Sequence, residues 1–193
     1  MYRLKYFMLF IIASLASCSG CNNTNIQATE HGHIIDVFPF RLTSPAFLSG
    51  DTIPALYTCD STNISPPLNW VNEFNNTASF AIIMDDPDAP MQTWVHWIVY
   101  NIPGDKLNLP AHFPMDSVLA DGTKQGFTGF HTTGYGGPCP PEGVHRYFFK
   151  LYVLDAKLNV PAGLTKSQLL DAMKGHILGE TEMFGKYIRK EKE

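Results

Sequence analysis

The chain has 193 residues, of which 45% are hydrophobic and 17% are charged, and its formal net charge is −4. This composition is typical of a single globular domain and excludes disorder over most of the length. A mildly acidic chain without a basic run also argues against nucleic acid as a partner.

The N-terminus has the features of an export signal. Two basic residues, Arg3 and Lys5, precede an uncharged and mostly apolar run over residues 7–16. A run of this length fits the core of a signal peptide, whereas a membrane span needs about 20 residues. The run ends in Leu15-Ala16-Ser17-Cys18, which resembles a bacterial lipobox, in which the cysteine receives lipid.

These features divide the chain into three parts. We predict a lipoprotein signal peptide over 1–17, a tether over 18–36 that is lipidated at Cys18, and a folded domain over 37–193. The lipid would hold the protein in a bacterial cell envelope. Because residue 19 is Ser and not Asp, we expect the periplasmic face of the outer membrane where the cell has two membranes. The alternative is an ordinary secretory signal that leaves Cys18 as a spare thiol.

The elements expected in the domain are mostly strands. In chain order, extended segments are predicted over 38–47, 53–59, 68–71, 78–84, 94–102, 146–154 and 183–188. The near-continuous apolar run over 78–84 indicates a strand that is buried on both faces. The alternation over 146–154 predicts one strand face made of Tyr147, Phe149, Leu151 and Val153. Residues 115–142 are rich in Gly and Pro, and a loop of this length is usually functional.

One helix is expected near the C-terminus. Residues 165–168 have the pattern of a capping box, with Thr165 as the N-cap residue and Gln168 three positions later. Apolar residues then follow at helical spacing: Leu169, Leu170, Met173, Ile177 and Leu178. A mostly β domain with a C-terminal helix indicates a β-sandwich.

Ionisable residues stand at three places in or beside the apolar strands. The run Asp85-Asp86-Pro87-Asp88 follows a strand, where acidic residues beside proline often only form a turn. His96 lies in an aromatic strand, where a lone histidine is more often a satisfied core residue than a ligand. Residues 136–141, Gly-Gly-Pro-Cys-Pro-Pro, precede His145-Arg146-Tyr147 at a strand start. Glycines there would let backbone N–H groups approach an anion.

Taken together and in this order, these motifs resemble those of the phosphatidylethanolamine-binding protein family, and within it the bacterial Raf-kinase-inhibitor-like branch. The resemblance runs from about Phe40 to Arg189. Its motifs are Tyr57-Thr58-Cys59-Asp60, Ser65-Pro66-Pro67-Leu68-Asn69-Trp70, Asp86-Pro87-Asp88-Ala89-Pro90, Trp94-Val95-His96-Trp97, Gly134-Tyr135-Gly136-Gly137-Pro138-Cys139-Pro140-Pro141 and His145-Arg146-Tyr147.

The resemblance implies a β-sandwich of antiparallel sheets with a C-terminal helix and short peripheral helices, and a small anion pocket at one end. Carried over by motif, the ligand-binding residues are Asp86, Asp88, His96, Gly137, Pro140, Pro141, His145 and Tyr147. Arg146 is expected to form an ion pair with Asp88 behind the pocket. Residues 126–131 depart from the pattern of the branch, and the sequence leaves open whether His131 faces the pocket or solvent.

Cys59 and Cys139 both lie in motifs shared with the family. In an oxidising compartment they would form a disulfide that braces the pocket loop. The alternative is a pair of buried thiols.

The resemblance further implies a non-enzymatic binding protein without a cofactor. Its ligand would be phosphate, phosphorylethanolamine or a phospholipid head group, and two histidines would make binding depend on pH near about 6–7. One alternative is an inhibitor or regulator of a protein partner, such as a protease or kinase, through the pocket rim. Another is a metal-dependent hydrolase in which Asp86, His96 and His145 form a two-His-one-carboxylate site.

Overall fold

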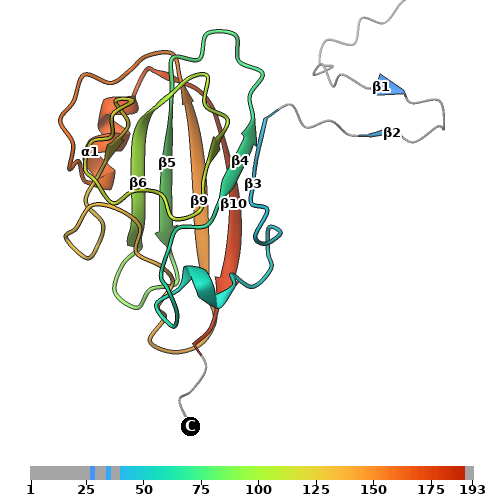
Figure 1. Cartoon of the computed structure of the whole chain (residues 1–193), viewed down its shortest axis with the longest axis vertical. Coiled ribbons are helices and arrows are strands. Elements are labelled where there is room, and N and C mark those ends of the chain that lie inside the picture. Colours follow the sequence, from blue (N-terminus) through green and yellow to red (C-terminus); the bar gives the residue numbers. More distant parts are fainter. Residues whose placement is uncertain (1–26, 29–33, 36–39, 190–193) are drawn as a thin grey trace, which may run out of the picture. The chain divides into compact units, whose positions relative to one another are not determined.

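A computed structural model describes residues 27–28, 34–35 and 40–189 (Figure 1). The chain forms two compact units, 1–37 and 38–193. In the first unit the short strands β1 (Gln27–Ala28) and β2 (Ile34–Ile35) pair in antiparallel fashion. Cys18 and the signal peptide lie outside the described residues, so export and lipidation stay predictions. No helix in the described ranges is long and apolar enough to cross a bilayer.

The second unit contains two antiparallel sheets. Its strands are β3 (Arg41–Thr43), β4 (Leu68–Val71), β5 (Ser79–Asp86), β6 (Trp94–Pro103), β7 (Asn108–Leu109), β8 (Lys124–Gln125), β9 (His145–Leu154) and β10 (Ile177–Tyr187). Five of them form a sheet in the order β10-β9-β5-β6-β8, and three form a second sheet in the order β3-β4-β7. The predicted fold class, mostly β with antiparallel sheets, is confirmed.

The hydrophobic core lies on both faces of the five-stranded sheet. Every residue of β5 is buried. Phe80 and Met84 belong to a cluster that includes residues of β3 and β4, whereas Ala81 and Ile83 belong to a cluster with residues of α1 (Lys166–Met173). The small sheet and α1 therefore cover opposite faces of the large sheet (Figure 1). This confirms the prediction that the apolar run over 78–84 is a strand buried on both faces.

The alternation predicted for β9 is also confirmed. The four residues of the predicted face, Tyr147, Phe149, Leu151 and Val153, are fully buried in the cluster between the two sheets. Arg146 lies on the other face and is exposed.

The helix begins as predicted and ends earlier. In its capping box, Gln168 N donates to Thr165 Oγ1 at 3.3 Å and Thr165 N donates to Gln168 Oε1 at 2.9 Å. The prediction that the helical spacing continues through Ile177 and Leu178 is wrong. Gly175 has a φ of +81°, which turns the chain after the helix, and Ile177 begins β10, a strand longer than the predicted segment 183–188.

Two other expected segments differ from prediction. Residues 53–59 do not form an extended piece, because Pro54 starts the 3₁₀ helix η1 (Ala55–Tyr57), in which Tyr57 N donates to Pro54 O at 3.0 Å. The first strand is only β3, because Ser44 Oγ donates to Pro67 O and accepts from Ala46 N, which turns the chain. The long segment 115–142 is mostly loop, as predicted, and contains β8.

Candidate functional site

Polar side chains meet at one end of the large sheet. Asp86 is the last residue of β5, His145 is the first residue of β9, and β6, on the other side of β5, carries His96 near its start. Because these neighbours are antiparallel, the end of β5 lies beside the starts of β6 and β9. Asp86, His96, His145 and Tyr147 have exposed fractions of 3%, 3%, 7% and 0%.

A β-bulge turns His96 toward this cluster. Met84 pairs with Trp97, but the next residue of β5, Asp85, pairs with Val95, so His96 is the extra residue on β6. A bulge changes the direction in which a side chain points. The His96 ring accordingly lies 5.1 Å from the ring of Tyr147, centroid to centroid, at an interplanar angle of 83°.

Asp86 holds the ring of His145. Asp86 Oδ2 lies 2.7 Å from His145 Nδ1, and Asp86 Oδ1 accepts from the backbone N–H of Asp88 at 2.8 Å. A carboxylate only accepts hydrogen bonds when ionised, so His145 carries a proton on Nδ1. Nε2 is the ring nitrogen that remains for a ligand.

His96 is held in the same tautomer by a backbone carbonyl. Its Nδ1 lies 2.6 Å from Gly136 O, which can only accept. Burial lowers the pKa of His96 below its usual value, although the Gly136 carbonyl and the charge of Asp86 act in the opposite direction. At neutral pH, Nε2 of His96 is therefore an acceptor.

Tyr147 is the incompletely bonded member of the cluster. Its hydroxyl is buried and makes no hydrogen bond of normal distance and angle among the described residues, although the backbone N–H of Cys139 lies close enough to lower its pKa. Burial, and then the charge of Asp86, raise the pKa of Tyr147, so the hydroxyl stays a donor. Its ring also stacks with that of His145, with centroids 6.5 Å apart. Buried polar groups are almost always satisfied, so this hydroxyl needs an explanation.

Asp88 and Arg146 form the expected ion pair. Arg146 Nη2 donates to Asp88 Oδ1 at 2.7 Å, and Nε and the backbone N of Arg146 donate to Oδ2 at 2.8 and 2.9 Å. The side-chain hydrogen bond from Arg146 is the main cause that lowers the pKa of Asp88 to about 2. Both carboxylate oxygens of Asp88 are engaged, so this residue positions the start of β9.

The glycines of the pocket loop do not offer free N–H groups, contrary to expectation. Gly136 N donates to His96 O at 2.9 Å, and Gly137 N donates to Asn63 Oδ1 at 2.8 Å. A Cβ on Gly137 would lie 2.4 Å from Asn63 Oδ1, so glycine serves close packing here. Pro140 is buried and Pro141 is exposed, and their part in a ligand rim stays a prediction.

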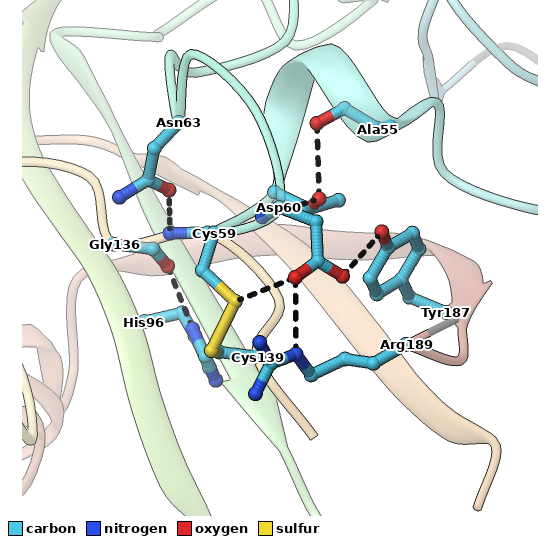
Figure 2. Close-up of a disulfide and its surroundings, with 11 residues drawn as sticks. Ala55, Cys59, Asp60, Asn63, His96, Gly136, Cys139, Tyr187 and Arg189 are labelled. Atoms are coloured by element: carbon cyan, nitrogen blue, oxygen red, sulfur yellow. Dashed lines mark hydrogen bonds and ion pairs between the residues drawn. A yellow bond between two sulfur atoms is a disulfide. The ribbon is translucent and has the colours of Figure 1, made fainter. Parts of the chain in front are cut away.

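A disulfide ties the pocket loop to the segment after η1. Cys59 and Cys139 are bonded, which is one of the two states that the sequence left open (Figure 2). Beside the bond, Cys59 N donates to Pro138 O at 3.1 Å. The loop that bonds to His96 is therefore covalently fixed.

Two cavities lie near the cluster. One, of about 800 Å³, is lined by His145 together with Asp88, Pro90, Glu142, Gly143, Val144, Arg146 and Lys186. The other, of about 470 Å³, lies at the start of α1 and is lined by His131 with Phe127 and Lys166 among others. His131 is exposed and belongs to this second cavity, away from the ring contacts of His96 and His145. Sequence reasoning missed Lys186, which had no signal beyond its alternation on β10.

The alternative metal site is not formed. Within residues 40–189, no group of three or more His, Cys, Asp and Glu side chains has an arrangement that could hold a metal ion. Asp86 and His145 use the 2.7 Å contact for a hydrogen bond to each other, and His96 Nδ1 bonds to a carbonyl instead.

Comparison with known proteins gives consistent matches over the second unit. Residues 43–188 match the family described as phosphatidylethanolamine-binding protein. A UPF0098 protein of Methanothermobacter thermautotrophicus is 49% identical over 149 residues, which cover 77% of this chain and 99% of the relative. A UPF0098 protein of Aquifex aeolicus is 43% identical over 161 residues, which cover 82% of this chain and 91% of the relative.

Solved structures agree with these matches. The phosphatidylethanolamine-binding protein homologue CT736 of Chlamydia trachomatis has a TM-score of 0.72 and 39% identity, over 78% of this chain and 98% of that chain. E. coli YbcL, described as a member of the mammalian PEBP family, has a TM-score of 0.70 and 29% identity, over 79% of this chain and 99% of its own.

Proposed function

Since the chain belongs to the phosphatidylethanolamine-binding protein family, we propose that it binds a phosphate monoester or a similar small anion at the cluster of Asp86, His96, His145 and Tyr147. The observation that carries this proposal is the buried Tyr147 hydroxyl without a partner. A phosphate oxygen would accept from it and remove the cost of leaving it unpaired, about 1–3 kcal/mol. The cavity of about 800 Å³ is lined by one residue of the cluster, His145.

We propose binding without turnover. The cluster consists of a carboxylate, two imidazoles and a phenol, and Asp86 and His96 are each already bonded through the 2.7 and 2.6 Å contacts that fix the rings. It has no Ser or Cys beside a base, the arrangement that nucleophilic catalysis needs.

The proton count decides which ionic form of the ligand fits. With Nδ1 bonded to Gly136 O, His96 presents Nε2 as an acceptor near neutral pH. A phosphate monoester has a second pKa of about 6, so its monoanion can donate one proton and its dianion none. At higher pH the free ligand is a dianion and free His96 is neutral. The complex holds one proton more than these two partners together, carried either by the ligand or by His96. The charge of Asp86 also disfavours the dianion. Affinity should therefore rise as pH falls.

The test is a calorimetric or NMR titration of the full-length chain with phosphorylethanolamine and with inorganic phosphate, at pH 6.0 and 7.5. We expect a Kd of about 1 mM, as for a ligand with few contacts, and about tenfold weaker binding at the higher pH. Phosphorylethanolamine and inorganic phosphate together separate recognition of the phosphate from recognition of the amine.

Two matched variants assign the site. Tyr147→Phe removes only the unpaired hydroxyl and should weaken binding about tenfold. Tyr152→Phe changes a second buried tyrosine of β9 that belongs to the other core cluster, and it should bind as the wild type does. Saturable binding that is the same in both variants would contradict the proposed site. Absence of binding at both pH values would contradict the proposed function and leave a protein partner as the remaining function for this surface.

We also propose that lipid on Cys18 anchors the domain in the cell envelope, which the lipobox-like Leu15-Ala16-Ser17-Cys18 supports. Metabolic labelling with palmitate in a bacterial host should mark the wild type and leave Cys18→Ser unlabelled. Equal labelling of Cys21→Ser and the wild type would show that Cys21 is not the modified residue. Label retained in Cys18→Ser would refute lipidation at Cys18.

A further inference from the structure

The Cys59–Cys139 disulfide is open to solvent at one of its two residues. Cys139 is exposed and Cys59 is half-buried, although Pro138 and Pro140 on either side of Cys139 are buried. Exposed disulfides are the ones that exchange with thiols most readily. The exposed residue of the bond is therefore Cys139, on the loop between two buried prolines.

The bond is also the covalent part of a clamp on the pocket loop. Three hydrogen bonds join the loop to the segment around Cys59: Cys59 N donates to Pro138 O at 3.1 Å, Gly137 N to Asn63 Oδ1 at 2.8 Å, and the Tyr135 hydroxyl to Tyr57 O at 2.7 Å. Figure 2 shows the disulfide with Asn63, Gly136 and His96 grouped around it.

The clamped loop holds His96 by both its backbone and its ring. Gly136, three residues before Cys139, donates through N to His96 O at 2.9 Å and accepts through O from His96 Nδ1 at 2.6 Å. The position of the loop therefore sets the orientation and the tautomer of the ring that lies against Tyr147.

The other side of the clamp is anchored independently. Asp60, next to Cys59, accepts from the Tyr187 hydroxyl at 2.9 Å and from Arg189 Nε at 3.0 Å (Figure 2). These bonds join the Cys59 side to the end of β10. If the disulfide opens, the Cys59 side keeps these bonds, whereas the loop that carries Cys139 is held by its hydrogen bonds alone.

We propose that the Cys59–Cys139 disulfide is a thiol–disulfide exchange site that controls ligand binding: the oxidised form holds His96 for the anion, and reduction by a dithiol releases it. A reductant thiolate attacks Cys139 Sγ, the S–S bond breaks, and Cys59 leaves as a thiolate that takes up a proton. The second thiol of the reductant then resolves the mixed disulfide and frees Cys139. Two electrons pass to the protein and the reductant becomes a disulfide. The binding part of this inference rests on the proposed function.

The experiment compares the oxidised full-length chain with the same protein treated with excess dithiothreitol in the absence of denaturant. Phosphorylethanolamine is titrated into both forms. Amide hydrogen exchange at Gly136 and Gly137 is measured by NMR as a readout that needs no ligand. We expect reduction in the folded state, about tenfold weaker binding, and exchange at least about tenfold faster at both glycines, because preorganisation of the site is lost.

A double variant, Cys59→Ser with Cys139→Ser, should reproduce the reduced form without a reductant. Tyr187→Phe is the control, because it removes a bond on the anchored side of Asp60 and leaves the disulfide and the loop contacts intact. It should keep the binding and the glycine exchange of the oxidised wild type. If the double variant fails to fold, the reduced wild type carries the test.

Resistance of the disulfide to dithiothreitol in the folded protein would overturn the inference. So would equal glycine exchange in the oxidised and reduced forms. Equal affinity in the two forms would overturn control of binding while the proposed function stands. If the oxidised protein does not bind, the proposed function fails, and control of ligand binding fails with it, whereas faster glycine exchange would still assign the exchange site and the loop release.

Discussion

Asp85 and Asp86 are adjacent, almost equally buried and yet opposite in character. Asp85, with 1% exposure, accepts from Lys166 Nζ and lies 3.6 Å from Lys150 Nζ. Asp86, with 3% exposure, accepts from His145 Nδ1 at 2.7 Å and from the backbone of Asp88 at 2.8 Å. They lie on opposite faces of β5, with Asp85 toward α1 and Asp86 toward the cluster between the sheets.

The difference lies in the partners and not in burial. The lysines beside Asp85 supply lasting positive charge, so its carboxylate is a structural lock between β5 and the first residue of α1. Asp86 has an imidazole as its partner, and the nearby ring of Tyr147 carries an unpaired hydroxyl. A buried acid therefore marks a candidate site only where the groups around it are incompletely bonded.

The largest loss of stability should come from removing the Asp85 carboxylate. Asp85→Ala leaves Lys166 and Lys150 without their carboxylate, and we expect a loss of about 2–3 kcal/mol in the free energy of unfolding. The value is at the low end for buried pairs because the lysine side chains are 27% and 32% exposed and regain water. Urea unfolding at pH 7.5 measures it, and the affinity of the folded protein for phosphorylethanolamine should not change.

Asp171→Ala is the matched control for that variant. Asp171 pairs with Lys174 on the exposed face of α1, where the two side chains are 64% and 78% exposed. This change should cost less than about 0.5 kcal/mol. Equal losses in the two variants would show that the Asp85 lock adds nothing beyond a surface pair.

Tyr147→Phe should act on stability in the opposite direction. Removal of a buried hydroxyl that has no partner should raise the free energy of unfolding by about 1 kcal/mol, while it weakens anion binding. Tyr135→Phe provides the contrast, since the buried Tyr135 hydroxyl donates to Tyr57 O at 2.7 Å and its removal should cost about 1–2 kcal/mol. Urea unfolding of both variants without ligand decides this; a loss of stability in Tyr147→Phe would mean that its hydroxyl is already satisfied.

The elements that the sequence predicted well are those set by local patterns. The apolar run of β5 and the alternation of β9 follow from which faces are buried, and the Thr165 capping box follows from residues three apart. The family motifs predicted that Asp86 and His145 share a pocket. Their direct contact was not predicted, because no local pattern connects positions 59 residues apart.

The rest depends on tertiary structure. His96 turns toward Tyr147 through a bulge in the β5–β6 register, which the aromatic sequence around it does not reveal. The expectation of free glycine N–H groups failed because Asn63, 74 residues away, occupies Gly137 N. Lys166 and Asp85 are 81 positions apart, and their contact needs the packing of α1 on the sheet.

The contribution of the Asp88–Arg146 ion pair to stability should depend on pH in the acid range. The pKa of Asp88 is lowered from 3.8 to about 2, so the Asp88–Arg146 pair stabilises the folded state fully above about pH 4. That contribution is lost as pH falls from about 4 to about 2, because the unfolded state then binds the proton more readily than the folded state. Asp88→Asn should be less stable than the wild type at pH 6, by less than the effects above, and the difference should shrink toward zero as pH falls through about 2. Urea midpoints across this range measure it, and a difference independent of pH would refute the assignment.

The smallest effect tests whether the lock at Asp85 is a pair or a triad. Lys150 Nζ lies 3.6 Å from Asp85 Oδ2, beyond a normal hydrogen bond, and 6.0 Å from the centroid of the Phe148 ring. Lys150→Met keeps the apolar stem and removes the charge, so it should cost less than about 0.5 kcal/mol. Lys166→Met removes the hydrogen-bonded partner and should cost distinctly more, although less than Asp85→Ala, because Lys150 remains beside the carboxylate. Equal losses of stability in the two lysine variants would show that Asp85, Lys150 and Lys166 act as a triad. The contrast with Asp86 would then be that Asp85 pairs with two lysines and Asp86 with one imidazole.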